Sequence, residues 1–104
     1  MTETEVSFEA IKSIYQQLRL DYKKICVQEF GKPSHKIDRH GNPITERRLW
    51  AQTALKDLNH MYDYACFLSK SDGAKLFAEG LDQDVELDTI YQSLLHCKID
   101  LGKL

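Results

Sequence analysis

The stretch from Thr45 to Leu68 constrains the fold most, because its apolar residues recur at alternating intervals of three and four. These apolar residues are Ala51, Ala54, Leu58, Met61, Ala65 and Leu68. Such spacing places them along one face of an α-helix, and Leu55 and Tyr62 widen that face. The opposite side is polar, with Gln52, Lys56, Asn59 and Asp63. The helix is therefore amphipathic and needs other apolar segments to cover it.

Two further segments show the same helical spacing. One runs from Phe8 to Ile25 and the other from Leu87 to Leu101. The first helix is predicted to begin between Thr2 and Ser7, where Thr2 and Glu5 suit a capping box. Gly31 and Pro33 are predicted to end it.

Helix-capping residues also delimit the remaining helices. Thr45 is the predicted N-cap of the central helix, and Asp82 and Asp84 are candidate N-caps of the last one, which Gly102 closes. A short helix over 73–79, ending at Gly80, is predicted between them.

The fold class follows from these patterns. No stretch alternates apolar and polar residues for long enough to build a sheet. The sequence predicts an all-α fold, a small antiparallel helical bundle of three main helices plus one short helix, in a single domain over residues 1–104. Two residues near the middle of each apolar face should be buried together with those of the other helices: Leu18, Ile25, Leu58, Met61, Leu94 and Cys97.

Residues 32–44 are predicted to form one long loop, because turn-forming residues interrupt the helical spacing. They include Pro33, Asp38, Gly41, Asn42 and Pro43. The segments 36–38 and 43–44 could pair as a small hairpin. A loop of about a dozen residues is long for a compact domain, so it is the first place to look for function.

Composition excludes several classes of protein. The apolar share of 42%, the charged share of 29% and the formal charge of −2 are ordinary for a globular protein and name no partner. The first nine residues resemble no secretory or mitochondrial signal, and no run of eighteen apolar residues occurs. We expect a cytoplasmic protein with no membrane partner, whose three cysteines, Cys26, Cys66 and Cys97, are reduced thiols at or near the core.

Motifs for catalysis, nucleotide binding or cofactor binding are missing from the sequence. We therefore predict no catalytic residue, no cofactor and no metal site. One alternative is a small metal-dependent enzyme that uses His35, Asp38 and His40, since histidine with carboxylate can bind zinc. The acidic run Glu79 to Asp88 lacks the glycine and final glutamate of a calcium loop, and helix capping explains most of it. Its alternative role is to dock a basic partner.

Aromatic residues of the central helix also lie off its main apolar face. Tyr64 and Phe67 are expected to be covered by the short helix through Leu76 and Phe77. If they are not covered, they are candidate anchors of a protein interface.

Positive charge gathers around the long loop. The stretch from Lys32 to Arg48 contains five basic residues and only two acidic ones, Asp38 and Glu46. Arg47 and Arg48 lie in the first turn of the central helix, where cations oppose the helix dipole, so helix stability gives no reason for them. The predicted partner-binding residues are Lys36, Arg39, Arg47, Arg48 and Trp50.

The predicted function is a small non-catalytic protein–protein interaction module, such as an adaptor, inhibitor or accessory subunit, that docks on a larger protein partner. The alternative from another class is nucleic-acid binding through residues 32–50, although the basic footprint is narrow and no known DNA- or RNA-binding module is visible. A homo-oligomer is also possible.

Overall fold

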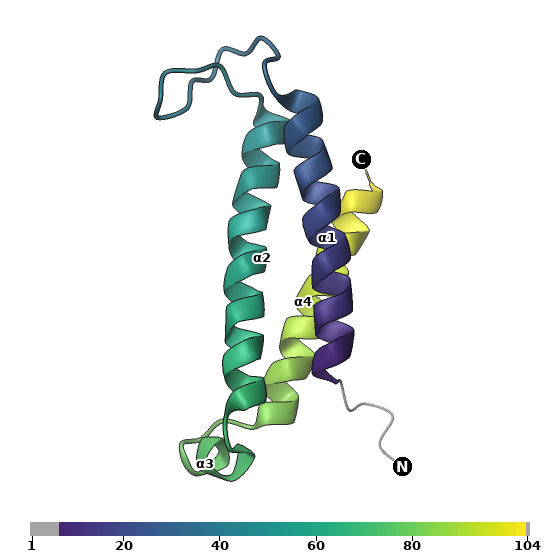
Figure 1. Cartoon of the computed structure of the whole chain (residues 1–104), viewed down its shortest axis with the longest axis vertical. Helices are drawn as coiled ribbons and strands as arrows, with labels where there is room; N and C mark the ends of the chain where they lie inside the picture. The colour runs from purple at the N-terminus through teal and green to yellow at the C-terminus, as the bar shows by residue number, and fades with distance from the viewer. Residues whose placement is uncertain (1–6, 104) are drawn as a thin grey trace.

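A computed structural model of the chain describes residues 7–103. It contains four helices, α1 (Phe8–Glu29), α2 (Glu46–Lys70), α3 (Gly73–Ala78) and α4 (Gln83–Gly102) (Figure 1). The β-type structure in this part of the chain is one isolated antiparallel bridge between Ile37 and Pro43. The predicted all-α class is therefore confirmed.

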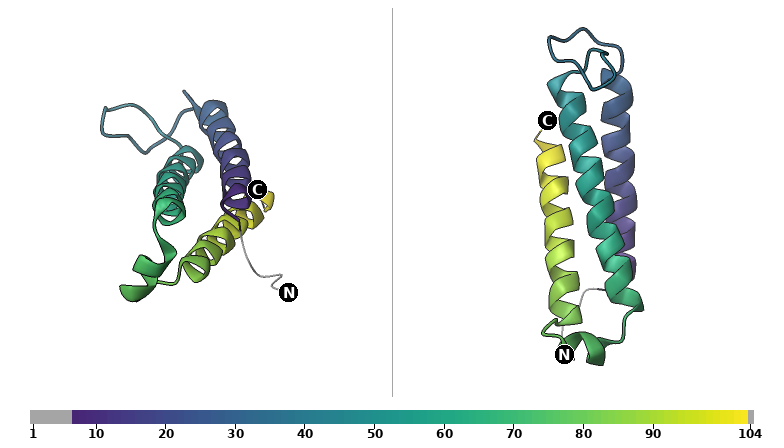
Figure 2. Two further views of the ribbon diagram at one scale, coloured as in Figure 1. Left: turned by 60° about the horizontal axis from the view of Figure 1, so that its bottom comes forward. Right: turned by 90° about the vertical axis from the view of Figure 1, so that its left-hand side faces the viewer.

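The three long helices lie side by side and give the molecule an elongated shape of 52 × 27 × 16 Å. α2 runs opposite to α1, and α4 runs back in the direction of α1 (Figure 1). Each of the three contacts the other two, while α3 lies at the turn between α2 and α4 (Figure 2). The loop between α1 and α2 projects from the other end of the molecule.

Most helix ends are marked by capping residues at the predicted positions. The Thr45 hydroxyl accepts the backbone N–H of Arg48 at 3.1 Å, and the carboxylate of Asp82 caps α4. α1 begins after its N-cap Ser7, the last residue of the predicted range, and the predicted capping box of Thr2 and Glu5 lies outside the described residues. Gly31 and Gly80 follow α1 and α3 with φ of 78° and 88°, a conformation that favours glycine.

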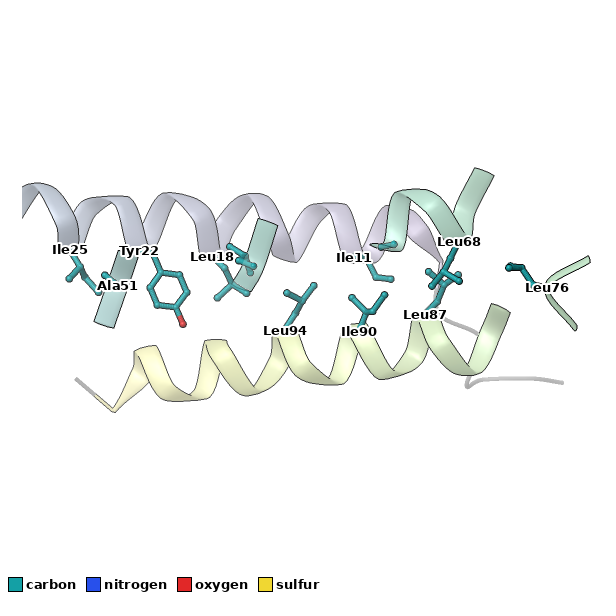
Figure 3. Packing of buried hydrophobic residues seen from close by; sticks show 12 residues of the cluster. Ile11, Leu18, Tyr22, Ile25, Ala51, Leu68, Leu76, Leu87, Ile90 and Leu94 are labelled. Carbon is teal, nitrogen blue, oxygen red and sulfur yellow. The ribbon is translucent and has the colours of Figure 1, made fainter. Parts of the chain in front are cut away.

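The core is one cluster of apolar side chains contributed by all four helices (Figure 3). Leu18, Ile25, Leu58 and Leu94 are buried in it, as predicted. Met61 and Cys97 are only half-buried and pack against its edge, so this part of the prediction is wrong. Each follows a fully buried leucine by three residues, which turns its side chain about 60° away from the centre of the buried face.

α3 buries a single side chain, Leu76. The prediction that this helix covers the aromatic residues of α2 is therefore wrong. Phe77 is 74% exposed and Phe67 is 54% exposed. The helix is too short to present a second residue on the side of Leu76, and Phe77 is turned about 100° from it. Tyr64 instead donates a hydrogen bond to Glu86 Oε1 at 2.8 Å and so joins α2 to α4.

The side chain of Gln83, the first residue of α4, donates hydrogen bonds to the backbone carbonyls of Leu68 and Ser71. These carbonyls lie at the end of α2, where the helix leaves its own acceptors unused. Gln83 therefore fastens the start of α4 to the end of α2. No helix within residues 7–103 is both long enough and apolar enough to cross a membrane.

Candidate functional site

The loop over residues 30–45 has a defined shape, because Asp38 organises its tip. Asp38 Oδ1 accepts the backbone N–H groups of His40 and Asn42, both at 2.9 Å. The N–H of Asn42 is the main cause that lowers the pKa of the Asp38 carboxyl. The predicted pairing of 36–38 with 43–44 is present, since the N–H of Ile44 donates to the Lys36 carbonyl at 3.0 Å. The loop is thus a small hairpin built on one aspartate.

The base of the loop is closed by Glu29, the last residue of α1. Its carboxylate accepts hydrogen bonds from Lys32 Nζ at 2.6 Å and from Thr45 Oγ1 at 2.8 Å. The bond from Lys32 is the main cause that lowers the Glu29 pKa, followed by the bond from Thr45. Ile44, which precedes Thr45, is buried and anchors the returning strand of the loop. The two ends of the loop are therefore held to each other and to the helices.

The glutamates at this end form ion pairs with lysines, whereas the arginines form none in the part of the chain that the structure describes. Glu29 pairs with Lys32, and Glu46 pairs with Lys36 at 3.3 Å. Among residues 7–103, no carboxylate lies within 4.0 Å of the guanidinium groups of Arg39, Arg47 and Arg48. These three cations give the loop end its excess of positive charge.

Arg48 lies against an exposed aromatic ring. Its Cζ is 4.8 Å from the centroid of the Phe30 ring, within the range of a cation–π interaction. Together with Cys26 and Val27, these two residues line a shallow depression of about 230 Å³. Val27 and Phe30 leave 75% and 73% of their surface exposed. Burial raises the pKa of the Cys26 thiol, so this cysteine contributes a neutral, weakly nucleophilic wall.

Trp50 lies apart from this depression. Its ring meets the buried Tyr22 edge-on, with centroids 5.3 Å apart. Positions 48 and 50 are turned by about 200° relative to each other on a helix, so Trp50 and Arg48 point to different sides of α2. Of the five predicted partner-binding residues, Arg39, Arg47 and Arg48 lie at the loop end of the molecule. Trp50 is separated from Arg48, and Lys36 is held in an ion pair with Glu46.

Sequence reasoning missed Val27 and Phe30. Val27 lies off the apolar face of α1, and Phe30 immediately precedes the glycine that ends the helix. An apolar residue on the polar side of an amphipathic helix is the signal that could have found Val27. We define the loop-end surface as Val27, Phe30, Ile37, Arg39, Arg47 and Arg48, all but the half-buried Arg48 exposed.

The structure does not bring His35, Asp38 and His40 together as a metal-binding group. No three His, Cys, Asp or Glu side chains in residues 7–103 are placed to hold an ion. One carboxylate oxygen of Asp38 is occupied by the loop backbone, and both histidines are exposed. The acidic run is used structurally at two points, where Asp82 caps α4 and Glu86 accepts the hydroxyl of Tyr64. That bond raises the pKa of Tyr64.

Comparisons with protein-family models, curated proteins and solved structures find no match to this chain. Its function is therefore inferred from the geometry of its own surfaces.

Proposed function

We propose that this protein is a non-catalytic interaction module that docks on a larger protein through the loop-end surface. The observation that carries the proposal is the exposed Phe30 ring with the Arg48 guanidinium held against it. Aromatic and arginine side chains are the residues that anchor protein interfaces most often. Since the hairpin is ordered by Asp38 and closed by Glu29, little conformational entropy is lost when a partner binds.

The partner's complementary surface should be acidic with an apolar side chain at its centre. Arg39, Arg47 and Arg48 have no carboxylate partner within the described chain, so carboxylates of another protein can pair with them. Arg48 is suited to this role because a planar guanidinium stacked on a ring still offers its edge to a carboxylate. An apolar side chain of the partner fits the depression between Val27 and Phe30.

The exposed apolar residues favour a protein over a nucleic acid. A phosphate backbone is recognised by rows of cations, and Glu29 and Glu46 interrupt such a row here. One face of the Phe30 ring is already occupied by Arg48 and is not free to stack on a base.

The test is affinity capture from lysate of the source organism with wild-type protein and with Arg48→Glu, followed by mass spectrometry. Arg19→Glu is the matched control, because Arg19 is exposed on α1 and contributes nothing to the loop-end surface. We expect one protein to be captured by the wild type and by Arg19→Glu, to be lost with Arg48→Glu, and to survive nuclease treatment. Equal capture by Arg48→Glu, or loss of capture after nuclease treatment, would contradict the proposal.

A further inference from the structure

The exposed face of α1 carries apolar residues that the core does not use. Leu20 is 59% exposed and lies seven residues, about two turns, before the exposed Val27 on the same side of the helix. We define the α1 outer face as Gln17, Leu20, Asp21, Lys24, Val27 and Gln28. Two large apolar side chains on one exposed stripe, with an acid and a base between them, form a surface that can pair with another helix.

This face is complementary to itself when it is reversed. In an antiparallel second copy, one register places Gln17 opposite Gln28 and Asp21 opposite Lys24, and it brings Leu20 to within two residues, about 3 Å along the axis, of the position opposite Val27. A two-fold axis makes each of these contacts occur twice, which is the geometry of an isologous dimer. We propose that the α1 outer face binds a second copy of this chain, with α1 antiparallel to its counterpart.

The charges on this face are available for such a pairing. Asp21 Oδ1 accepts a hydrogen bond from the Gln17 amide at 3.1 Å. Within residues 7–103, neither Lys24 nor Lys98 of α4 lies within 4.0 Å of a carboxylate. Asp21 of one copy can therefore receive Lys24 of the other without breaking an existing ion pair.

A groove between α1 and α4 runs beside the α1 outer face, and four residues of that face line it: Gln17, Asp21, Lys24 and Gln28. Two depressions of about 480 and 380 Å³ form it, and they adjoin each other at Asp21 and Lys98, which line both. Their walls include the apolar side chains of Ile14, Leu95 and Leu101. A helix placed along the α1 outer face would cover these walls on one side and Leu20 and Val27, which line neither depression, on the other.

Apolar burial supplies the attraction in this dimer, and the charges set its register. Exposed ion pairs add little affinity, but like charges placed opposite each other are strongly unfavourable. Charge reversal therefore tests the register directly. Val27 belongs to both proposed surfaces, but none of the reversed residues belongs to the loop-end surface, so the effect of charge reversal on the dimer can be told apart from an effect on the proposed partner.

The experiment is sedimentation analysis of the full chain from about 1 µM to about 1 mM, the range in which weak dimers form. The wild type should show a dimer that dissociates on dilution. Asp21→Lys places two lysines opposite each other and Lys24→Asp places two aspartates opposite each other, so each should weaken the dimer at least about tenfold. An equimolar mixture of the two variants restores both pairs and should form a heterodimer of wild-type stability.

Two controls separate this register from general effects of charge. Arg19→Glu changes a residue turned by about 200° from Asp21 on α1, Asp63→Lys changes an exposed residue of α2, and both should leave the dimer unchanged. Circular dichroism establishes whether each variant is folded. If Asp21→Lys does not fold, Lys24→Asp, which changes an exposed residue, tests the register alone. A monomer at every concentration, or a dimer that survives both reversals and gains nothing on mixing, would overturn the proposal.

Discussion

The hydroxyl of Thr45 donates a hydrogen bond to Glu29 Oε1 at 2.8 Å and thereby joins the last residue of α1 to the residue that precedes α2. The same hydroxyl accepts the N–H of Arg48 as the helix cap. One side chain thus closes the loop and starts the second helix. Phe30 follows Glu29 in the chain, so the two bonds of Thr45 join the residue next to Phe30 to Arg48, whose guanidinium lies over the Phe30 ring.

Thr45→Val removes both hydrogen bonds while it keeps the shape of the side chain. We expect it to lower the free energy of unfolding by about 1 to 2 kcal/mol, the usual cost of a lost N-cap. Urea denaturation measures this change. Thr45→Ser keeps the hydroxyl and should stay within about 0.5 kcal/mol of the wild type. Equal losses in the two variants would show that the hydroxyl is not the cause.

Leu58→Ala tests the core at the centre of α2. Leu58 is fully buried, so truncation leaves a cavity and should cost about 2 to 5 kcal/mol in the free energy of unfolding. Val85→Ala is the control, since Val85 is exposed and its truncation should change stability by less than about 0.5 kcal/mol. A loss below about 1 kcal/mol for Leu58→Ala would mean that this face of α2 is not packed.

The order of the hairpin should depend on pH through Asp38. Its pKa lies below the ordinary value because the folded loop donates hydrogen bonds to the carboxylate. This contribution to stability is present above the unfolded pKa of about 3.9 and is lost as the pH falls through the lowered folded pKa. The amide NMR signals of His40 and Asn42 should therefore titrate with a midpoint below that of an ordinary aspartate. A midpoint at or above the ordinary value would contradict the hydrogen bonds at the loop tip.

Tyr22 should make the protein sensitive to alkali. Burial, reinforced by the nearby Cys97, raises its pKa well above 10.0. Folding therefore favours the neutral form of Tyr22. The resulting contribution to stability is fully present below the unfolded pKa of about 10, and it is lost as the pH rises through the raised folded pKa. Tyr22→Phe should reduce the fall in stability above that pH, as denaturation at a series of alkaline pH values can measure. An unchanged pH dependence would place its cause at other groups, such as the cysteine thiols.

The helices could be predicted from the sequence because their signals are local. The spacing of apolar residues, the oxygen of Thr45 or Asp82 before a helix and the glycines after one act within a few residues. The loop-end surface is harder to predict from the sequence. Phe30 and Arg48 lie on opposite sides of the loop, so their contact depends on how the whole loop brings α2 back beside α1. The separation of Trp50 from Arg48 was nevertheless visible, because residues two apart do not share a side of a helix. The half-burial of Met61 and Cys97 depends on how far each helix is rotated, which apolar spacing alone does not fix.

The order of the helices along the chain also bears on how quickly the protein folds. α1 packs on α2, which follows it, and α2 packs on α4 after only the α3 turn. Most contacts between helices therefore join helices that follow one another in the chain, and helical topologies of this kind fold in microseconds to milliseconds. The pairing of α1 with α4 is the exception, because both connections must close before it can form. We expect the hairpin of α2 and α4, fastened by Gln83, to be able to form before α1 docks.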